Sequence, residues 1–570
     1  MAVLESIMGA WPQVLQYRAT NTFIVAILFP FLLTWLFTSL QSLRAVAAAR
    51  QAAPGSKRPP TLPTIVPFIG HVLRFSLDGH KFLFGAVRHF GRGVPVRVNL
   101  ATFSSYIVSG QETVSAFLKD PAKGLSQTSR SLNIMTNAFG CPAHLVHLFK
   151  AREDQDLEHQ IHSALQGMLT GARLETLAGR YQEAVVHQVL DGDAKIGDDW
   201  TTLPDLCTFV ENNIFEAATR AVFGPYLVEL NPTISVDFWN FNRHVKSMFM
   251  GVPRWLNPAS VASRDTMTDH VKRWQRHAQE NCRIDEIPDD VEWEPYYGSK
   301  STRIRQQLLT KRGILDESAR AAENLAFMWA TNANSVPAAC WFLLETLHDP
   351  ALKKRVMSQL ESANIVDESE KRQFKYDIVK LTSNPLLQSV FAEVLRLRVA
   401  VLVVRQPTQD HYSLGGWHIK KGETVCLSTR NELLDSDFWN AGTLADPHPL
   451  GNFWADRFLV YPNDPSSGPL KEPKRRTGNK DSLVGEEPSF SLDGCTWNWI
   501  PFGGGRNLCP GRHFAKREIM LTAAIFLKAY DIELLTDTLP DPDESVFGFG
   551  TMPPNAKVPC RIRRRQTLNC

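Results

Sequence analysis

The chain has 570 residues, of which 44% are hydrophobic and 21% are charged, and its formal net charge is +3. This composition is typical of a globular protein and excludes a disordered chain, and the small net charge gives no sign of a nucleic-acid partner. The nine cysteines are scattered without a Cys-x-x-Cys pair, which argues against a disulfide scaffold and a structural zinc site and fits a reducing compartment.

The first predicted element is a membrane-spanning helix over residues 20–43, preceded by a short N-terminal segment, residues 1–19. No charged side chain lies between Arg18 and Arg44, and the apolar stretch has about the 20 residues needed to cross a bilayer. A cleaved signal peptide is the alternative, but the apolar run is too long for one and no basic segment precedes it. We therefore expect a retained anchor in the lipid bilayer.

Basic residues predict the orientation of this helix. Only Arg18 precedes the helix, whereas four basic residues follow it: Arg44, Arg50, Lys57 and Arg58. By the positive-inside rule, a single-pass protein with this pattern has its bulk in the cytoplasm. Five prolines within residues 51–70 indicate that residues 44–70 form a stiff, basic, proline-rich hinge.

Residues 71–570 are interpreted as one large, mainly helical domain with small sheets. Long periodic stretches broken by Pro, Gly and Asn predict helices over residues 155–190, 262–282 and 317–348. Residues 401–430 alternate and contain turn signals, so short strands are expected there.

The last third of the chain contains two irregular segments. Residues 461–495 are polar and rich in Pro, Gly and Ser, and are expected to form an exposed insertion. Residues 547–565 are expected to form a terminal hairpin. Within the helix predicted over 317–348, Pro337 cannot donate a hydrogen bond to the carbonyl of Ala333, so a bend is expected over residues 333–337.

The sequence PFGGGRNLCPGRHFA, residues 501–515, places three glycines before Cys509 and a Pro-Gly pair after it. A phosphate loop is one interpretation, but the Gly-Lys-Ser/Thr ending of a Walker loop is absent. A small buried structural cysteine is the second. The third is a thiolate metal ligand, because a helix beginning near Gly511 would direct free N–H groups at the sulfur and lower the thiol pKa. A thiolate on a glycine-lined bed is what an axial ligand to haem iron requires.

This loop resembles the signature of the cytochrome P-450 family, F-x-x-G-x-R-x-C-x-G. Four residues have the spacing of that signature: Phe502, Gly505, Cys509 and Gly511. The arginine stands at Arg506, and Asn507 takes its usual place. Three further elements resemble the family in the right order: Glu393 and Arg396 of the E-x-x-R helix, Arg405 after it, and Arg457 with Phe458 in place of P-E-R-F.

The resemblance implies a mainly α fold with small sheets, a single P-450-type haem domain behind a transmembrane helix, and a place in the endoplasmic reticulum membrane. It implies haem b with Cys509 as the axial thiolate. Glu393, Arg396 and Arg457 would form a buried ion network, Arg405 would bind a haem propionate, and Phe502 would pack beside the sulfur. The candidate cofactor-binding residues are Cys509, Phe502, Gly505, Arg506, Gly511, Arg405, Glu393, Arg396 and Arg457.

The bent helix departs from the usual A-G-x-[D/E]-T pattern of family monooxygenases. The matching positions are Ala330, Thr331, Asn332, Ala333 and Asn334, which lack the acid and the final threonine. The pattern is similar to the branch that contains sterol 7α- and 12α-hydroxylases and prostacyclin synthase. The resemblance implies a dioxygen groove here, with Ala330, Asn334 and Ser335 as candidate catalytic residues. A packing kink with capping polar groups is the alternative interpretation.

That branch contains both hydroxylases and an isomerase, so two activities stay open. The first is a monooxygenase that oxidises an apolar terpenoid, sterol or lipid-like substrate with dioxygen and electrons from an NADPH-dependent reductase. The second is a haem-thiolate isomerase or dehydratase of a peroxide or other oxygenated substrate, which needs no reductase. A non-catalytic haem protein is a third possibility.

Two sets of residues follow from the monooxygenase interpretation. A basic face for an acidic reductase would consist of Arg506, Arg512, Lys516 and Arg517, or these would be ordinary solvated charges. Apolar positions that face the substrate in the family are Trp329, Ala330, Val401, Leu402, Thr551 and Met552. The GGGRNLCPG variant and the polar insertion resemble family members of fungal secondary-metabolite biosynthesis.

Overall fold

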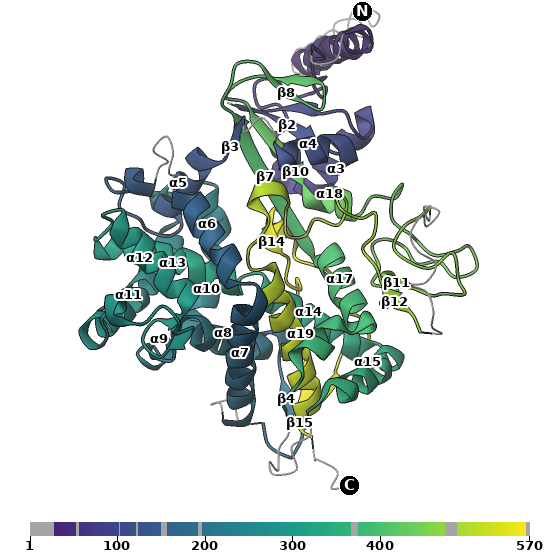
Figure 1. Cartoon of the computed structure of the whole chain (residues 1–570). Helices are drawn as coiled ribbons and strands as arrows, with labels where there is room; N and C mark the ends of the chain where they lie inside the picture. Colours follow the sequence, from purple (N-terminus) through teal and green to yellow (C-terminus); the bar gives the residue numbers. More distant parts are fainter. Residues whose placement is uncertain are drawn as a thin grey trace, which may run out of the picture. The chain divides into compact units, whose positions relative to one another are not determined.

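The structure, a computed structural model, describes residues 28–52, 56–101, 103–120, 124–149, 157–191, 196–365, 374–472 and 487–565. Its helices and short strands (Figure 1) fall into two compact units. Unit 1 comprises residues 1–126 and 402–431, and unit 2 comprises residues 127–401 and 432–570. The expected fold class, mainly α with small sheets, is confirmed.

Unit 1 begins with the helix Leu28–Gln51, which is long and apolar enough to cross a membrane, with a mean hydropathy of 1.2 and only 6% of its most apolar window buried. The predicted segment 1–19 and the first part of the predicted span lie outside the described residues. The helix continues past the expected end at residue 43 into the predicted hinge. Later in the hinge, the N–H of Leu62 donates to the carbonyl of Arg97, so this part of the hinge lies along a strand of unit 1.

The sheet of unit 1 is built from segments far apart in the sequence. Strand β2 pairs antiparallel with β1 and parallel with β10, and β10 pairs antiparallel with the unit 1 part of β7, which also pairs with β3. The pattern V-R-V-N-L in β1 alternates buried and half-buried residues, as a strand with one covered face does. The elements are α2 Val72–Leu77, α3 Gly79–Phe90, β1 Val96–Leu100, β2 Phe103–Val108, α4 Gln111–Lys119, β3 Leu125–Ser126, β7 Val399–Pro407, β8 Tyr412–Leu414, β9 Trp417–Ile419, β10 Thr424–Ser428 and α18 Thr429–Leu433, of which β7 and α18 continue into unit 2.

Unit 2 contains most of the helices. Several begin with an Asp or Asn whose side chain accepts an N–H of the first turn, followed in α11, α15 and α17 by proline at a position where no N–H is needed. The helices are α5 Thr128–Asn137, α6 Leu157–Met168, α7 Gly171–Asp191, α8 Leu206–Phe223, α9 Tyr226–Glu229, α10 Ile234–Phe249, α11 Pro258–Asn281, α12 Lys300–Lys311, α13 Glu317–Asn332, α14 Ser335–His348, α15 Pro350–Ala363, α16 Ile378–Ser383, α17 Pro385–Arg398 and α19 Arg512–Ala529.

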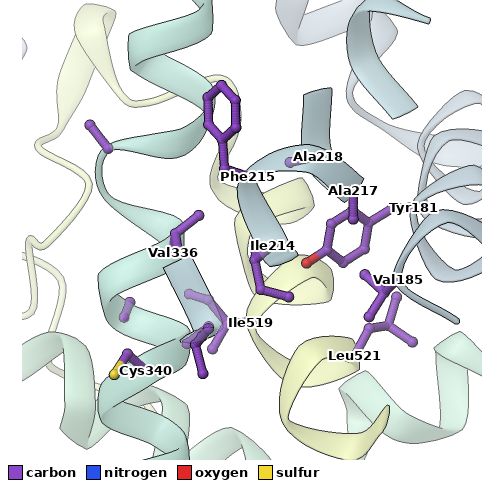
Figure 2. Close-up of a cluster of buried hydrophobic side chains, with 14 of the residues drawn as sticks. Tyr181, Val185, Ile214, Phe215, Ala217, Ala218, Val336, Cys340, Ile519 and Leu521 are labelled. Carbon is purple, nitrogen blue, oxygen red and sulfur yellow. The ribbon is translucent and has the colours of Figure 1, made fainter. Parts of the chain in front are cut away.

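The core of unit 2 surrounds α14, whose side chains from Ser335 to Thr346 are all buried. A helix that is apolar on every side is expected at the centre of a bundle. Figure 2 shows Val336 of α14 near Ile214 of α8 and Ile519 of α19 in one apolar cluster. Helices α14 and α19 therefore form the interior support for the residues at their N-terminal ends.

Two sequence predictions are wrong. The terminal segment forms no hairpin, because β14 (Phe549–Thr551) pairs with residues 399–401 of β7, whereas β15 (Cys560–Arg564) pairs with β13 (Tyr530–Leu534) and β4 (Thr201–Leu203). The structure also contains a disulfide, which joins Cys207 of α8 to Cys340 of α14, although the scattered cysteines fitted a reducing compartment. Both sulfurs lie in the apolar core, where no spacing rule identifies a partner.

A short strand pair encloses most of the predicted polar insertion. Strand β11 (Leu459–Val460) pairs with β12 (Ser489–Phe490), and the residues between them are described up to 472 and again from 487.

Candidate active site

The glycine-rich stretch forms a tight loop directly before α19. Gly503 and Gly505 have φ angles of 72° and 64°, which side-chain-bearing residues adopt only with strain. The N–H of Cys509 donates to the carbonyl of Phe502 over 3.1 Å and closes the loop. Residues 505–507 form a short exposed 3₁₀ turn. The glycines therefore allow the chain to turn back and leave a face of bare backbone beside the cysteine.

The N-terminus of α19 supplies hydrogen-bond donors to the sulfur of Cys509. The backbone N–H groups of Gly511 and Arg512 lower the thiol pKa, as does the charge of Arg512. Burial is the larger effect, however, and the pKa of Cys509 is raised overall. The expected lowering of the thiol pKa is therefore wrong for the free thiol, because the helix end does not outweigh the loss of solvation.

A histidine that the sequence did not single out holds the same loop. Nε2 of His162, on α6, lies 2.9 Å from the carbonyl oxygen of Leu508. The N–H of Leu508 donates to Gly505, so both polar groups of this residue are bonded. A single histidine on a helix belongs to no recognisable sequence motif. Its contact with the cysteine loop arises only because the fold places α6 beside that loop.

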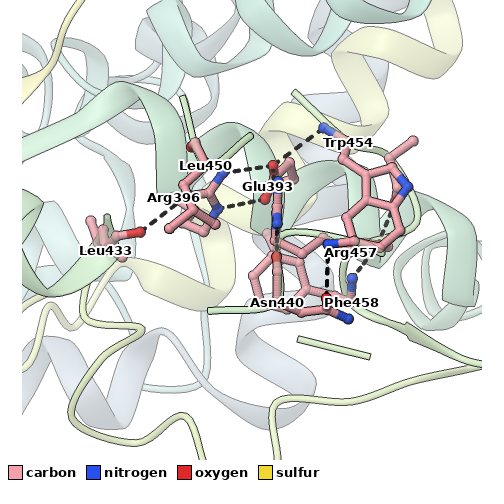
Figure 3. A network of polar contacts seen from close by, with 12 residues as sticks. Glu393, Arg396, Leu433, Asn440, Leu450, Trp454, Arg457 and Phe458 are labelled. Carbon is pink, nitrogen blue, oxygen red and sulfur yellow. Dashed lines mark hydrogen bonds and ion pairs between the residues drawn. The ribbon is translucent and has the colours of Figure 1, made fainter. Parts of the chain in front are cut away.

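The three charged residues predicted as an ion network lie together (Figure 3) and are fully buried. Both guanidinium groups donate to Glu393: Arg396 over 2.7 and 2.8 Å, and Arg457 over 3.0 Å. Burial by itself would raise the pKa of Glu393, but the two arginines outweigh it and hold the pKa below its ordinary value. A charged cluster of this kind needs every polar atom paired in order to be tolerated inside a protein.

Three backbone carbonyls extend the ion network, and Nη2 of Arg457 stays without a partner among the described residues. Arg396 donates to the carbonyl of Leu433 over 3.1 Å and to that of Leu450 over 2.8 Å, and Arg457 donates to that of Asn440. Glu393 also accepts the N–H of Trp454 over 3.2 Å. The network therefore joins α17 to the irregular segment over residues 433–458, which has little regular secondary structure of its own.

An aromatic pair connects α17 to the cysteine loop. Nε1 of Trp499 donates to the carbonyl of Ala392, which precedes Glu393, over 3.2 Å. The rings of Trp499 and Phe502 meet edge to face with centroids 6.1 Å apart. Since Phe502 also accepts the N–H of Cys509, the ion network and the cysteine loop belong to one connected arrangement.

The helix predicted over residues 317–348 is interrupted where the sequence indicated. Helix α13 ends at Asn332 and α14 begins at Ser335. Pro337 lies in the first turn of α14, where its missing N–H leaves no gap in the helix. The helix is therefore interrupted at residues 333 and 334, within the range of the predicted bend.

The three candidate catalytic residues lie at this interruption and have different surroundings. Ala330 is exposed although Met328 and Asn332 are buried, which places an open space beside this face of α13. Asn334 is half-buried, and its Oδ1 accepts the N–H of Thr551 over 2.9 Å. The hydroxyl of Ser335 donates to the carbonyl of Thr331 over 2.9 Å. These residues therefore offer an apolar surface, an amide and a hydroxyl.

Comparison with known proteins identifies the family. The sequence profile described as Cytochrome P450 matches residues 60–448 and 493–560. The chain belongs to the cytochrome P450 family. Cytochrome P450 monooxygenase fsoE from Humicola fuscoatra is 63% identical over 559 residues, which cover 97% of this chain and 96% of the relative. Cytochrome P450 monooxygenase efuG from Hormonema carpetanum is 62% identical over 540 residues, which cover 94% and 95%.

A more distant relative of this P450 is the cholesterol 7-alpha-monooxygenase of Cricetulus griseus, which is 25% identical over 519 residues, 87% of this chain and 91% of the relative. The predicted resemblance to sterol hydroxylases is confirmed. The predicted enzyme class, a cytochrome P450 monooxygenase, is confirmed as well.

The family implies a haem-thiolate iron, and the surroundings of Cys509 fit that cofactor. No cluster of three or more His, Cys, Asp or Glu side chains within the described ranges could hold a metal ion. A metal at Cys509 must therefore bring its other ligands with it, as a porphyrin does. The loop offers one sulfur with two N–H donors and an exposed glycine-rich backbone, which suits a flat macrocycle.

Arg405, the expected propionate partner in this P450, lies on the unit 1 part of β7. Its side chain is buried, donates to the carbonyl of Phe117 over 2.7 Å, and has its charged carbon 5.0 Å from the centre of the Phe117 ring. Its role toward a propionate stays a prediction.

The predicted basic face is smaller than the sequence indicated. Arg512 donates to the carbonyl of Cys509, Arg517 pairs with Glu175, and Lys516 donates to Gln388 over 2.6 Å. Burial, followed by the charge of Arg517, lowers the pKa of Lys516 to about 8. Arg506 is the member of the set that is exposed and makes no hydrogen bond or ion pair with the described residues.

A buried carboxyl also lies near the helix interruption of this P450. Glu518 of α19 is 1% exposed, and its Oε1 has no hydrogen-bond partner among the described residues. Burial raises its pKa to about 8, an effect that the Ser335 hydroxyl reduces by hydrogen bonding. The carboxyl is therefore protonated at neutral pH. Sequence reasoning missed it because Glu on a long helix is usually a surface residue.

Proposed function

We propose that this P450 is a membrane-anchored monooxygenase that oxidises an apolar, terpenoid, sterol or lipid-like substrate in fungal secondary metabolism. Dioxygen and electrons from an NADPH-dependent reductase drive the reaction. The helix Leu28–Gln51 anchors the protein in the endoplasmic reticulum membrane, and the catalytic part faces the cytoplasm. Two relatives above 60% identity over nearly the whole chain support the monooxygenase over the isomerase.

The observation that carries this proposal is the cysteine loop and its support. Cys509 holds the haem iron through its sulfur, on a loop that Gly505, Arg506 and Gly511 shape and Phe502 covers from the side. When bound, the haem supplies the oxidising iron, and a thiolate ligand favours cleavage of the O–O bond. The ion network of Glu393, Arg396 and Arg457 fixes the segment that packs against α17, and Arg405 binds a propionate.

On the substrate side, the interruption between α13 and α14 supplies the polar groups. Asn334, whose Oδ1 accepts the N–H of Thr551, would offer its amide N–H₂ beside Ala330, and the buried hydroxyl of Ser335 donates to the carbonyl of Thr331. The family's acid and threonine are absent, so the amide orients the substrate or the oxygen. The apolar lining favours a substrate without charge.

A half-buried aromatic cluster supports an apolar substrate. Trp329, which precedes Ala330, lies 5.3 Å from Phe249 and 6.1 Å from Phe139 between ring centroids, and Phe249 lies 5.6 Å from Phe549. Nε1 of Trp329 donates to Asn242 over 2.8 Å, which fixes its ring. Ring faces of this kind bind flat or polycyclic hydrocarbons through area and shape.

The test is a carbon monoxide difference spectrum on membranes that contain the full chain. One sample is reduced by NADPH with a fungal reductase, and the other by dithionite. The monooxygenase gives the thiolate-type band in both samples, and Cys509→Ala gives it in neither. A band with dithionite alone would favour the isomerase, and a band retained by Cys509→Ala would exclude this cysteine as the ligand.

A further inference from the structure

A strand of unit 2 holds the side chain of Asn334. Oδ1 of Asn334 accepts the N–H of Thr551 over 2.9 Å. Directly after β14, the N–H of Met552 donates to the carbonyl of Arg398, so the Thr551 N–H faces away from β7 and toward the helix interruption. The amide of Asn334 thus completes the hydrogen bonding of a strand more than two hundred residues later in the chain.

This contact depends on the residue before Thr551. Gly550 has a φ angle of 147°, and a Cβ placed on it would lie 1.9 Å from Oδ1 of Asn334 and 2.9 Å from its Cγ. No side chain is compatible with both the strand and the amide in these positions. A residue larger than glycine would displace the amide, and the φ angle of 147° would also strain β14 at that residue.

The Asn334 side chain is half-buried, and Ala330 nearby is exposed. Ala330 and Asn334 are four residues apart and lie on the same face of the interrupted helix. Ala330 is exposed, and Nδ2 of Asn334 makes no hydrogen bond to the described residues. Oδ1 is bonded to the strand, and Nδ2 lies 3.4 Å from a Cβ placed on Gly550, so the glycine also makes room for the N–H₂ group.

We propose that Gly550 is a positioning residue of this P450, which lets β14 hold the Asn334 amide in one orientation with its N–H₂ group toward the substrate side. This inference deepens the proposed function and rests on it, because it takes the space beside Ala330 as the place of the reaction. Gly550 touches no substrate. It acts through Asn334, and the Thr551 N–H selects which end of the amide is presented.

Four variants separate the parts of this arrangement. Asn334→Asp keeps an acceptor for the Thr551 N–H and removes the N–H₂ donor. Asn334→Leu has a similar shape and removes both. Gly550→Ala displaces the amide. Gly313→Ala is the matched control, since Gly313 has a φ angle of 71° but a Cβ there meets nothing within 4 Å.

The first measurement is hydrogen exchange at the Thr551 amide in the full-length protein. We expect exchange to be about fivefold faster or more in Asn334→Leu and Gly550→Ala, which is the protection that one hydrogen bond gives. Asn334→Asp and Gly313→Ala should exchange like the wild type. Unchanged exchange in Asn334→Leu overturns the proposal, and this readout does not depend on whether Gly550→Ala loads haem.

The second measurement uses carbon monoxide as a probe of the substrate side in the reduced protein. An N–H₂ group in one orientation gives one narrow C–O stretching band, and loss of the donor shifts it. We expect a shifted band in Asn334→Asp and Asn334→Leu, several bands in Gly550→Ala, and the wild-type band in Gly313→Ala. A wild-type band in Gly550→Ala or in Asn334→Asp overturns the proposal.

The two measurements distinguish the failure of this inference from the failure of the proposed function. If the wild type shows no thiolate-type carbon monoxide band, the proposed function fails, whereas the exchange measurement still reports on the hydrogen bond. If that band is present but none of the three site variants alters the C–O stretch, the function stands and the positioning role is wrong.

Discussion

Nε2 of His162 lies 2.9 Å from the carbonyl oxygen of Leu508, so α6 is bonded to the cysteine loop one residue before Cys509. The contact restrains the peptide that leads to the sulfur. A donor at this position opposes any movement of the loop away from α6.

His162→Leu should therefore reduce the free energy that stabilises the loop by about 1 kcal/mol, the usual net value of one hydrogen bond. His162→Gln can place an N–H near the same point, so it should retain most of this stabilisation. The measurement is the rate at which the thiolate-type carbon monoxide band converts to the inactive form on warming. Equal rates for Leu, Gln and wild type would show that the contact does not restrain the loop.

Replacing any one residue of the buried ion network should strongly destabilise the protein. Arg457→Leu leaves Glu393 and Arg396 in the interior with incomplete pairing, which costs about 3–5 kcal/mol. We expect loss of bound haem and a lower midpoint of chemical unfolding. The matched control is Arg355→Leu, because Arg355 pairs with the neighbouring Asp456 at the surface, where a pair contributes about 0–1 kcal/mol. Similar losses in both variants would contradict the assigned role of the network.

Glu518 predicts a pH dependence of stability. Its pKa is about 8 in the folded protein and lies near 4.5 when unfolded, so the unfolded chain releases this proton first as pH rises. Stability therefore falls between about pH 4.5 and pH 8 and is constant on either side of that window, where both states have the same protonation. Glu518→Gln removes this contribution. Relative to the wild type, the variant should gain stability from pH 5 to pH 8, by a few kcal/mol in free energy of unfolding.

The measurement is urea unfolding of the wild type and Glu518→Gln at several values of pH. A surface exchange, Glu286→Gln, serves as the control and should leave the pH profile unchanged. Parallel profiles for the wild type and Glu518→Gln would show that the buried carboxyl is not protonated in the folded state.

The disulfide between Cys207 and Cys340 closes a loop with a sequence separation of 133 residues. In the chain-entropy account a cross-link over such a loop contributes about 2–4 kcal/mol or somewhat more. The double change Cys207→Ala with Cys340→Ala should lower the free energy of unfolding by this order. A reducing agent should destabilise the wild type and leave the double variant unaffected. Peptide mapping without reduction should recover the two cysteine peptides linked, and Cys141→Ala is the control with a buried free thiol.

Local chemistry could be predicted from the sequence. Pro337 indicates the helix interruption because the missing N–H acts within one turn. Glu393 and Arg396 are three apart on a helix, so they lie on the same face once α17 forms. The glycines around Cys509 predict an unusual backbone conformation, because that conformation depends on the glycines themselves. These features depend on neighbours in the chain.

Long-range relationships could not be predicted. Thr551 meets Asn334, His162 meets Leu508, and Cys207 meets Cys340 only because the helices and strands pack as they do. The prediction of a terminal hairpin is wrong for the same reason. Strands β14 and β15 each pair with other strands far away in the sequence. The pKa of Cys509 depends on burial, which no spacing of residues reveals.

The central strand pairing of unit 1 has a consequence for synthesis of the chain. Strand β2 is made early, but its parallel partner β10 belongs to residues 424–428 and emerges only after residues 127–401. At ordinary rates of translation, β2 waits on the order of tens of seconds with one edge unpaired. An exposed edge of this kind is prone to pair with other chains. A lower growth temperature, or a chaperone that binds nascent chains, should therefore raise the yield of soluble protein. Substitutions that stabilise unit 2 should raise it less.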